Sequence, residues 1–493
     1  MFEKGGHMIC NILPEDFRME AYEPLQGESD HTIFSGDERI EIHTAAEDFP
    51  FYDEAGRMEA VLTTMSFLRK TRNAQERPVM FIWDGGPGSA TSSLLLECFG
   101  PWRKSRNPGQ RYELTEEADN ILDICDLVFM DPAGVGYSRL LNPDKKAKYW
   151  SVDGDARSCA FALTEWLRRH GRLGSPLYIC GESYGTIRAC RVVAELGVSP
   201  ASESRMMLGL PVAGVIMIGM ATSPRGREGF PLEPGMESLT AALPTMAAVN
   251  WYHHHDRIAA ESSFRTQDEF VEAAWRLGAE EVFPARFYGS CCPDERTAEI
   301  SGKLAFFTGM DREYFVQSQL TLCSTEDFAT RVTADEGDRV GVYDATKRCP
   351  LREKFNQMGD RNEGIIYMNR EMTEKMGIRT NRMYYTANIT LYYPWDYSTE
   401  NLGQDTRTHL DCLSDAMQKN RSMKLLVAGG RYDLLTLVGN TRFALMHSRI
   451  PKEQVTVREY YAGHGVYSSE EGRSQFLKDV RHLIGDAGAV CGQ

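Results

Sequence analysis

Residues 181–185 of this 493-residue chain read GESYG, a serine held between two glycines. An apolar run, PLYIC at 176–180, precedes them, and a helix-compatible stretch, TIRACRVVAEL, follows. Glycine tolerates a bend that a Cβ would obstruct, and a serine in such a strand-to-helix turn is lifted above the sheet. The pattern therefore predicts that Ser183 is a nucleophile.

A serine hydroxyl becomes nucleophilic when an imidazole takes its proton and a carboxylate fixes the tautomer of that imidazole. Asp433 in GGRYDLL and His464 in AGHGVY follow Ser183 in the chain order that α/β-hydrolases use. Each comes after an expected strand, where a parallel sheet presents its ligands. Singly, Asp433 could cap the next helix and His464 could be an ordinary surface histidine. Together the three residues favour a catalytic triad.

A glycine loop, GGPGS at 85–89, directly follows the apolar segment PVMFIW at 78–83. Glycines let backbone N–H groups approach a developing alkoxide, and each such donor contributes about 3 to 4 kcal/mol of transition-state stabilisation. The amides of Gly86 and Tyr184 are the expected oxyanion hole. A tight turn is the alternative. A phosphate-binding loop is disfavoured, because Pro87 lacks an N–H and no Lys-Ser/Thr pair follows.

Strand and helix patterns alternate through the first half of the chain and resume near its end. An antiparallel pair is expected at 38–45 and 58–68. A helix is expected at 153–172, where acidic residues precede and basic residues follow an apolar spacing of three and four. Further strands, mostly apolar, are expected at 78–83, 126–131, 176–180, 212–219, 424–430 and 454–460.

This alternation predicts an α/β-hydrolase fold, with a mostly parallel central sheet flanked by helices and a helical cap insertion. The middle of the chain has helical stretches, proline-bearing loops and no repeating strand signal. The expected parts are an N-terminal arm at 1–30, the hydrolase core at 31–221 and 421–493, and a mostly helical cap at 222–420.

Composition restricts the partners of the chain. It carries 55 Lys and Arg against 70 Asp and Glu, and a net charge of −15 repels nucleic acid and anionic membranes. The first residues lack the apolar segment of a secretory signal, no apolar run reaches the length of a membrane span, and the twelve cysteines form no CxxC pair. We therefore expect a cytoplasmic location with reduced thiols.

Two further segments invite functional interpretations that the residues do not favour. Consecutive histidines at 253–255 would point in different directions on a helix, so a metal site is not expected there. The aromatic segment at 383–397 is expected to be cap core or pocket wall, because the acidic charge argues against base stacking.

Five segments together resemble the serine carboxypeptidase family: FIWDGGPGS, DLVFMDPAGVGYS, YICGESYG, VAGGRYDLLT and AGHGVY, which occur in the family's order. LPTMAAVNWYH at 243–253 is similar to a cap segment of the family's bacterial members. The resemblance is dense over 57–220 and 420–470. It implies an α/β-hydrolase fold, a cap that shapes the substrate pocket, and release of a C-terminal amino acid through an acyl-enzyme.

The resemblance also assigns two residues to the free carboxylate of the substrate: Glu182, before the nucleophile, and Asp84, at a position that is usually Asn. An ionised Asp84 cannot donate a hydrogen bond and would repel a carboxylate. Shared protons between Asp84 and Glu182 would give an acid-shifted peptidase profile. The alternative is that Asp84 only accepts a hydrogen bond from a backbone amide. Two other departures are Gly465, where relatives commonly carry Met, and Ser89, where many secreted relatives have a disulfide cysteine.

The chain is thus expected to be a serine carboxypeptidase-like hydrolase that acts on a peptide or small acyl substrate without a metal or organic cofactor. Ser183 attacks the carbonyl, His464 acts as base and then as acid, and Asp433 orients His464. The alternatives are an esterase or acyltransferase with the same triad, and a non-catalytic hydrolase-fold binding protein. Neither nucleic acid nor a membrane is an expected partner, and a homodimer is left open.

Overall fold

The computed structural model describes residues 22–104, 112–197, 209–210, 212–221, 240–353, 355, 359–391, 395–397 and 408–488. The chain divides into two compact units. The first comprises Met1–Val215, Met358–Asp405 and Arg481–Gln493, and the second comprises Ile216–Gln357 and Thr406–Val480. In this division residues 358–405 fall in the first unit, and the two strands after residue 420 fall in the second. The arm, core and cap stay a prediction.

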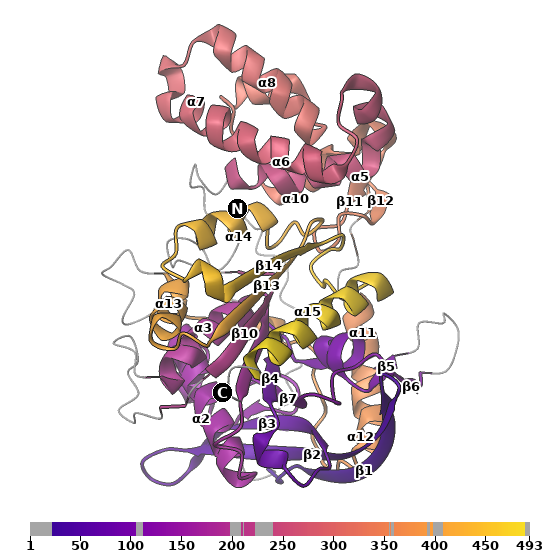
Figure 1. Ribbon diagram of the computed structural model, residues 1–493, viewed down its shortest axis with the longest axis vertical. Helices are drawn as coiled ribbons and strands as arrows, with labels where there is room; N and C mark the ends of the chain where they lie inside the picture. The colour runs from indigo at the N-terminus through magenta and orange to yellow at the C-terminus, as the bar shows by residue number, and fades with distance from the viewer. Residues whose placement is uncertain are drawn as a thin grey trace. The chain divides into compact units, whose positions relative to one another are not determined.

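The strands of the first unit follow the order β1-β2-β3-β7-β4-β9-β10 (Figure 1). Neighbours among β1, β2, β3 and β7 are antiparallel, whereas β4 is parallel to both β7 and β9. The expected antiparallel pair and the interior strands of this unit are therefore confirmed. The bounds are β1 Gln26–Ser35, β2 Glu38–Tyr52, β3 Met58–Arg69, β4 Val79–Trp83, β5 Trp102–Lys104, β6 Leu114–Glu116, β7 Asp126–Asp131, β8 Arg139–Leu140, β9 Leu177–Glu182 and β10 Val212–Ile218.

Helices cover both faces of this sheet. In β4 and β9, Met80 is aligned with Tyr178, so Phe81 and Tyr178 point to opposite faces. Phe81 meets the ring of Trp166 from α2 edge-on at 5.4 Å, and the Tyr178 hydroxyl donates to the backbone oxygen of Ile484 in α15. The helices of this unit are α1 Lys146–Tyr149, α2 Val152–Arg169, α3 Tyr184–Leu196, α11 Gly359–Ile366, α12 Thr373–Lys375 and the end of α15 Glu470–Gly488. Shorter helical turns span Ala74–Glu76, Leu94–Phe99, Pro143–Lys145, Tyr367–Met372 and Ile389–Leu391.

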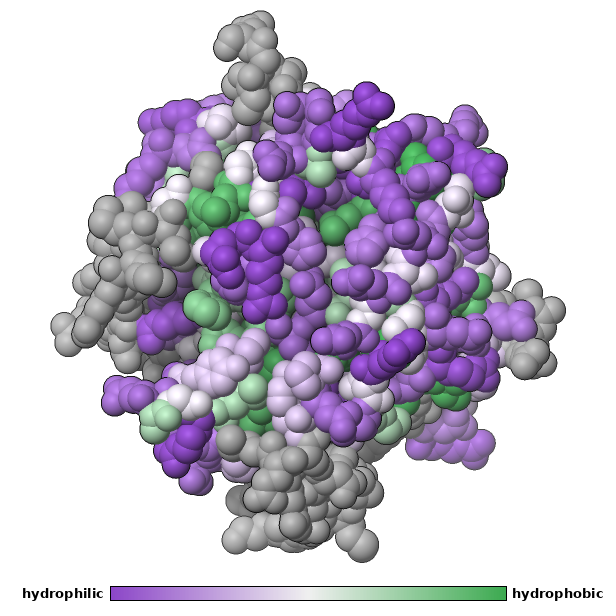
Figure 2. Space-filling model, turned by 90° about the horizontal axis from the view of Figure 1, so that it is seen from below, coloured by the Kyte–Doolittle hydropathy of each residue, from purple (hydrophilic) through white to green (hydrophobic). Residues whose placement is uncertain are grey.

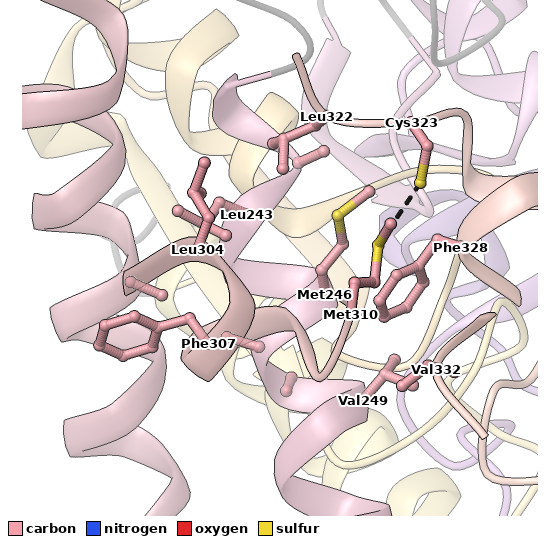
Figure 3. Close-up of a cluster of buried hydrophobic side chains, with 14 of the residues drawn as sticks. Leu243, Met246, Val249, Leu304, Phe307, Met310, Leu322, Cys323, Phe328 and Val332 are labelled. Carbon is pink, nitrogen blue, oxygen red and sulfur yellow. Dashed lines mark hydrogen bonds between the residues drawn. The ribbon is translucent and has the colours of Figure 1, made fainter. Parts of the chain in front are cut away.

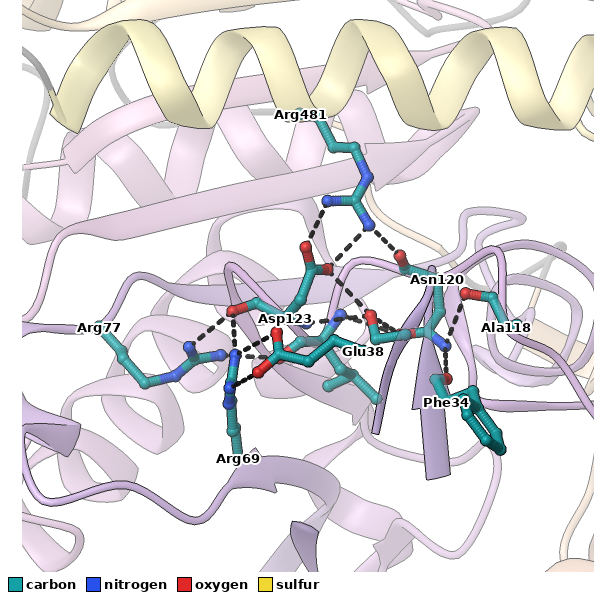
Figure 4. A network of polar contacts seen from close by, with 10 residues as sticks. Phe34, Glu38, Arg69, Arg77, Ala118, Asn120, Asp123 and Arg481 are labelled. Carbon is teal, nitrogen blue, oxygen red and sulfur yellow. Dashed lines mark hydrogen bonds and ion pairs between the residues drawn. The ribbon is translucent and has the colours of Figure 1, made fainter. Parts of the chain in front are cut away.

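A polar network fixes the segment that leads into β7 (Figure 4). Arg69 and Arg77 both donate to the backbone oxygen of Asp123, and Arg481 forms an ion pair with the Asp123 carboxylate at 2.7 Å. Burial alone would raise the pKa of Asp123, but hydrogen bonds from Arg481 and Ser35 outweigh it and lower the pKa below its usual value. The network ties the end of α15 to this edge of the sheet.

The second unit contains two parallel strands and most of the long helices (Figure 1). Its strands are β11 Asp338–Val340, β12 Arg348–Pro350, β13 Lys424–Gly430 and β14 Val455–Tyr460. Its helices are α5 Leu243–Glu261, α6 Gln267–Leu277, α7 Phe283–Tyr288, α8 Asp294–Thr308, α9 Arg312–Gln317, α10 Thr325–Arg331, α13 His409–Lys419 and α14 Val438–Met446. Shorter helical turns span Gly278–Val282, Gly289–Cys291, Ala334–Glu336 and Lys452–Gln454.

Helices α5 to α10 and the segment after them up to Ala345, which together we call the helical insertion, share one hydrophobic core. In this core, side chains of α5 point toward those of α8 and α10 (Figure 3). Met246 and Val249 from α5, Leu304 from α8 and Phe328 from α10 are all buried. A capping box at Thr266 and Glu269 starts α6. The insertion therefore has the apolar interior of an independent packing unit.

The face of the molecule shown in Figure 2 is largely hydrophilic, with apolar residues in small separate patches. Among the described segments, no helix combines the length and the apolar character that crossing a bilayer requires.

Candidate active site

Ser183 lies at the turn between β9 and α3, in the strand–turn–helix context that the sequence predicts. Its φ of 56° and ψ of −125° put it among three non-glycine residues with positive φ in the described part of the chain. Such a conformation is strained for a residue with a Cβ and is commonly retained at functional sites. The flanking glycines leave no room for a side chain, because a Cβ on Gly181 would lie 2.1 Å from the Gly185 oxygen and one on Gly185 would lie 2.9 Å from the Asp84 oxygen.

The glycine loop after β4 lies directly against this turn. A Cβ on Gly85 would lie 2.5 Å from the Tyr184 nitrogen and 2.9 Å from the Ser183 Cβ. Tyr184 is the first residue of α3, so its N–H has no intrahelical acceptor. Gly86 has a φ of 103°, and a Cβ there would lie 2.6 Å from the Gly88 nitrogen. The two predicted oxyanion donors, Gly86 and Tyr184, thus belong to segments in direct contact.

A buried ion pair supports this half of the site, and the sequence reasoning did not single it out. Arg188 in α3 donates from Nε to Asp155 in α2 at 2.7 Å and from Nη1 to the Asp84 backbone oxygen at 2.6 Å. Burial alone would lower the pKa of Arg188, but the Asp155 carboxylate outweighs it and raises the pKa. Trp83 donates from Nε1 to the Gly185 oxygen at 2.9 Å. The glycine loop and the first turn of α3 are therefore held together from beneath.

The two carboxylates assigned to substrate recognition end neighbouring strands. Trp83 is aligned with Gly181, so Asp84 and Glu182 follow at the same edge of the sheet, and both are buried. Asp84 Oδ1 accepts a hydrogen bond from the Gly85 nitrogen at 2.6 Å. The alternative interpretation, in which Asp84 only accepts a hydrogen bond from a backbone amide, expects this contact. Recognition of a terminal carboxylate by these residues stays a prediction.

Asp433 and His464 form a buried pair in the second unit. The Nδ1 atom of His464 lies 2.8 Å from Asp433 Oδ2, and Asp433 is fully buried. The carboxylate therefore holds the proton of the neutral imidazole on Nδ1, so that the lone pair of the base is on Nε2. Asp433 Oδ1 accepts from the nitrogens of Leu435 and Thr436, in a turn that precedes α14. Asp433 thus caps this turn and not the helix itself, whose N-cap is Leu437.

Thr436 and Gly219 also lie beside the histidine, and neither was among the predicted site residues. The Thr436 hydroxyl donates to Asp433 Oδ2 and lies 3.3 Å from His464 Nδ1. Gly219 follows β10 with a φ of 56°, and a Cβ there would lie 2.8 Å from the Thr436 hydroxyl and 3.2 Å from His464 Cε1. A hydroxyl three residues after the acid in DLLT was the available signal for Thr436.

The predicted site residues therefore fall into two groups, one in each unit. Ser183, Tyr184, Glu182, Asp84 and Gly86 belong to the first unit, which supplies a hydroxyl and two backbone amides of the kinds that acyl transfer requires. The second unit contributes Asp433 and His464, which can accept and return a proton.

The histidine tract at 253–255 and the aromatic segment at 383–397 both contact other parts of the chain. His253 contacts the Ala345 oxygen at 2.7 Å, and His254 contacts Asn250 and Glu336. Within the described ranges, no group of three or more His, Cys, Asp or Glu is arranged to hold a metal ion. From the aromatic segment, Trp395 meets the Tyr184 ring edge-on at 5.3 Å, beside the turn that carries Ser183 in the first unit.

Comparison with known proteins agrees with these observations. The family model described as "Serine carboxypeptidase" matches residues 65–204. Serine carboxypeptidase-like 3 of Arabidopsis thaliana is 26% identical over 186 residues, which cover 34% of this chain and 41% of that protein. Serine carboxypeptidase-like 1 of the same plant is 30% identical over 170 residues, covering 33% and 36%. The match thus spans about two fifths of these relatives or less.

A prohormone-processing carboxypeptidase from Saccharomyces cerevisiae has a similar structure, with a TM-score of 0.54 and 12% identity over 90% of this chain and 92% of that chain. At this identity the likeness concerns the fold, and it confirms the predicted α/β-hydrolase class. The special resemblance to bacterial members stays a prediction. Residues 65–204 of this chain thus match the serine carboxypeptidase family model, within a chain that has the α/β-hydrolase fold.

Proposed function

We propose that this chain is a serine carboxypeptidase-like hydrolase in which Ser183, His464 and Asp433 form a catalytic triad. The observation that carries the proposal is the left-handed backbone of Ser183 at the β9–α3 turn, with the free first amide of α3 beside the Gly85 loop. A strained serine beside unpaired backbone donors serves nucleophilic catalysis and has no evident structural purpose. The buried Asp433–His464 pair supplies the matching base.

The proposed reaction proceeds in two steps through an acyl-enzyme. His464 Nε2 takes the proton of the Ser183 hydroxyl, whose oxygen attacks the scissile carbonyl carbon, while the amides of Gly86 and Tyr184 stabilise the oxyanion. The C–N bond then breaks, and Nε2 returns the proton to the leaving amine. Water, deprotonated by the same nitrogen, hydrolyses the ester and frees Ser183. Asp433 stabilises the imidazolium in both steps.

For a peptide substrate, Glu182 and Asp84 are the proposed contacts of the terminal carboxylate. Their support is their position at the ends of β9 and β4, next to the nucleophile turn. At least one of the carboxyl groups must be protonated to donate to the substrate, so the peptidase profile should shift to acid.

An esterase or acyltransferase with the same triad is the second candidate, because Asp84 Oδ1 already accepts a hydrogen bond from the Gly85 amide. In that case the site has lost one of its two means of holding a carboxylate.

Turnover of a blocked dipeptide acid, its amide and its ester separates the two candidates. The carboxypeptidase proposal expects a preference of about tenfold or more for the free acid over the amide, as expected when buried polar groups recognise a charged group. Asp84→Asn should raise the neutral-pH peptidase rate, since Asn can donate to the carboxylate. Equal rates on acid and amide, with fast ester turnover, would favour the second candidate. A Ser183→Ala variant controls for contaminating hydrolases.

We also propose a reducing, cytoplasmic location. Its support is that none of the ten cysteines in the described ranges forms a disulfide. Reaction of the native protein, isolated without reductant, with a thiol reagent should label the exposed Cys291, and a protein isolated with that thiol oxidised would argue against the proposal.

A further inference from the structure

A short segment of the helical insertion, residues 342–345, crosses both loops that carry the acid–base pair. We call this segment the strap. The Leu434 nitrogen donates to the Val342 oxygen at 3.0 Å, and the His464 nitrogen donates to the Tyr343 oxygen at 2.6 Å. The Ala345 nitrogen donates to the Tyr432 oxygen at 2.9 Å. Three backbone hydrogen bonds thus attach the strap beside Asp433 and at His464.

The fit between the strap and the histidine loop leaves no room for a side chain. A Cβ on Gly463 would lie 2.4 Å from the Tyr343 oxygen and 2.7 Å from Asp344 Cα. The Tyr343 ring also meets the His464 ring edge-on at 5.5 Å. A shift of the strap would therefore move the backbone and the ring of His464.

His253 in α5 anchors the strap at its far end. Its Nε2 atom lies 2.7 Å from the Ala345 oxygen, and a carbonyl can only accept, so Nε2 carries the proton. Burial lowers the pKa of His253, which favours the neutral ring. Val342 and Ala345 belong to the hydrophobic core of the insertion, so the strap is packed as well as hydrogen-bonded.

The first turn of α6 also forms hydrogen bonds with the loops that carry Asp433 and His464. Gln267 Nε2 donates to the Tyr432 hydroxyl at 3.1 Å. Asp268 Oδ1 accepts from the Tyr461 hydroxyl at 3.1 Å and from Arg431. Residues on both sides of Asp433 and upstream of His464 are thus held by the insertion.

We propose that the helical insertion positions the general base, and that His253 is a positioning residue for the reaction, acting through the strap. This inference rests on the proposed triad. It gives the insertion a part in catalysis that is independent of substrate selection, because the strap contacts the loops of Asp433 and His464 directly.

The test compares His253→Leu with His255→Leu, a matched variant in the same histidine tract. The His255 side chain is 59% exposed and is paired with Asp256 at the surface. His253→Leu should lower kcat for an ester substrate, and the rate of phosphonylation by a fluorophosphonate, by about tenfold or more, as displacement of catalytic groups does. KM should change by less than about twofold. His255→Leu should match the wild type, and His253→Gln, which restores an N–H at similar reach, should recover part of the rate.

A His253→Leu protein with wild-type kcat would overturn the inference, as would a His253→Gln protein no faster than His253→Leu. If His253→Leu does not fold, Asp268→Asn replaces it, since this exposed and isosteric change only weakens the grip on Arg431 and Tyr461. Asp268→Asn should then lower kcat severalfold with an unchanged melting temperature, and an unchanged kcat would overturn the inference. A wild-type protein that does not react with the fluorophosphonate would refute the triad itself, whereas equal reaction of wild type and His253→Leu would refute only the role of the strap.

Discussion

Thr436→Val should impair the Asp433–His464 pair without changing the fold around it. The Asp433 carboxylate accepts four hydrogen bonds: two at Oδ1 from backbone nitrogens, and two at Oδ2 from His464 and the Thr436 hydroxyl. Valine has nearly the shape of threonine but cannot donate. Oδ2 would then be held by His464 alone, in a site from which water is excluded because Asp433 is fully buried.

The magnitude follows from the charge of the acceptor. A hydrogen bond to a charged group contributes about 1.5 to 3 kcal/mol. Each 1.36 kcal/mol of transition-state stabilisation corresponds to about a tenfold rate. If the lost bond appears in full in the transition state, kcat/KM should fall by about 10- to 100-fold.

The assay is the second-order rate of phosphonylation by a fluorophosphonate, together with kcat/KM for an ester substrate. Thr436→Ser keeps the hydroxyl and should stay within a few-fold of the wild type. Wild-type rates for Thr436→Val, with the same folded fraction by circular dichroism, would refute the assignment of Asp433 and Thr436 to one hydrogen-bonded group.

Three further predictions concern the frame around the site. Gly219→Ala should reduce phosphonylation by about tenfold or more, because its Cβ would meet Thr436 and the His464 ring. Gly289→Ala, at a similar φ of 53° with no atom within 4 Å, should not, and equal losses would show that backbone strain alone is responsible. Arg188→Met should lower the free energy of unfolding in urea by about 3 to 5 kcal/mol, because the buried Asp155 loses its partner. Arg168→Met, which removes an exposed pair, should leave the urea midpoint nearly unchanged, and similar shifts in both variants would contradict this account. Arg481→Gln should destabilise the protein at neutral pH, since the lowered pKa of Asp123 contributes stability above the ordinary carboxyl pKa that is lost as the pH falls through the folded value. The difference from wild type should shrink below about pH 4, and a difference that grows in acid would contradict the sign.

Local patterns in the sequence account for the elements that carry the predicted site residues. Glycines surround Ser183, and apolar runs precede Asp84, Ser183 and Asp433. A glycine determines the turn it belongs to, and an apolar run determines the strand it forms, so these turns and strands follow from the sequence alone. The α/β-hydrolase class follows from the alternation of these elements.

Contacts between segments that are distant in the sequence could not be predicted from such local patterns. The strap at 342–345 holds His464 through backbone atoms, which leave no signature in side-chain type. Arg188 and Asp155 meet across two helices, and only the presence of arginines among the apolar residues of α3 hinted at buried partners. Trp395 packs on the ring of Tyr184 in the first unit, although the two residues are far apart in the sequence.

The most direct test of the proposed chemistry is to identify the residue that a fluorophosphonate modifies, by mass spectrometry of the intact protein and its peptides. One adduct per chain is expected, on Ser183, which is lost in Ser183→Ala and formed far more slowly in His464→Ala. An unmodified wild-type protein, or an adduct on another residue that survives Ser183→Ala, would contradict the proposed chemistry.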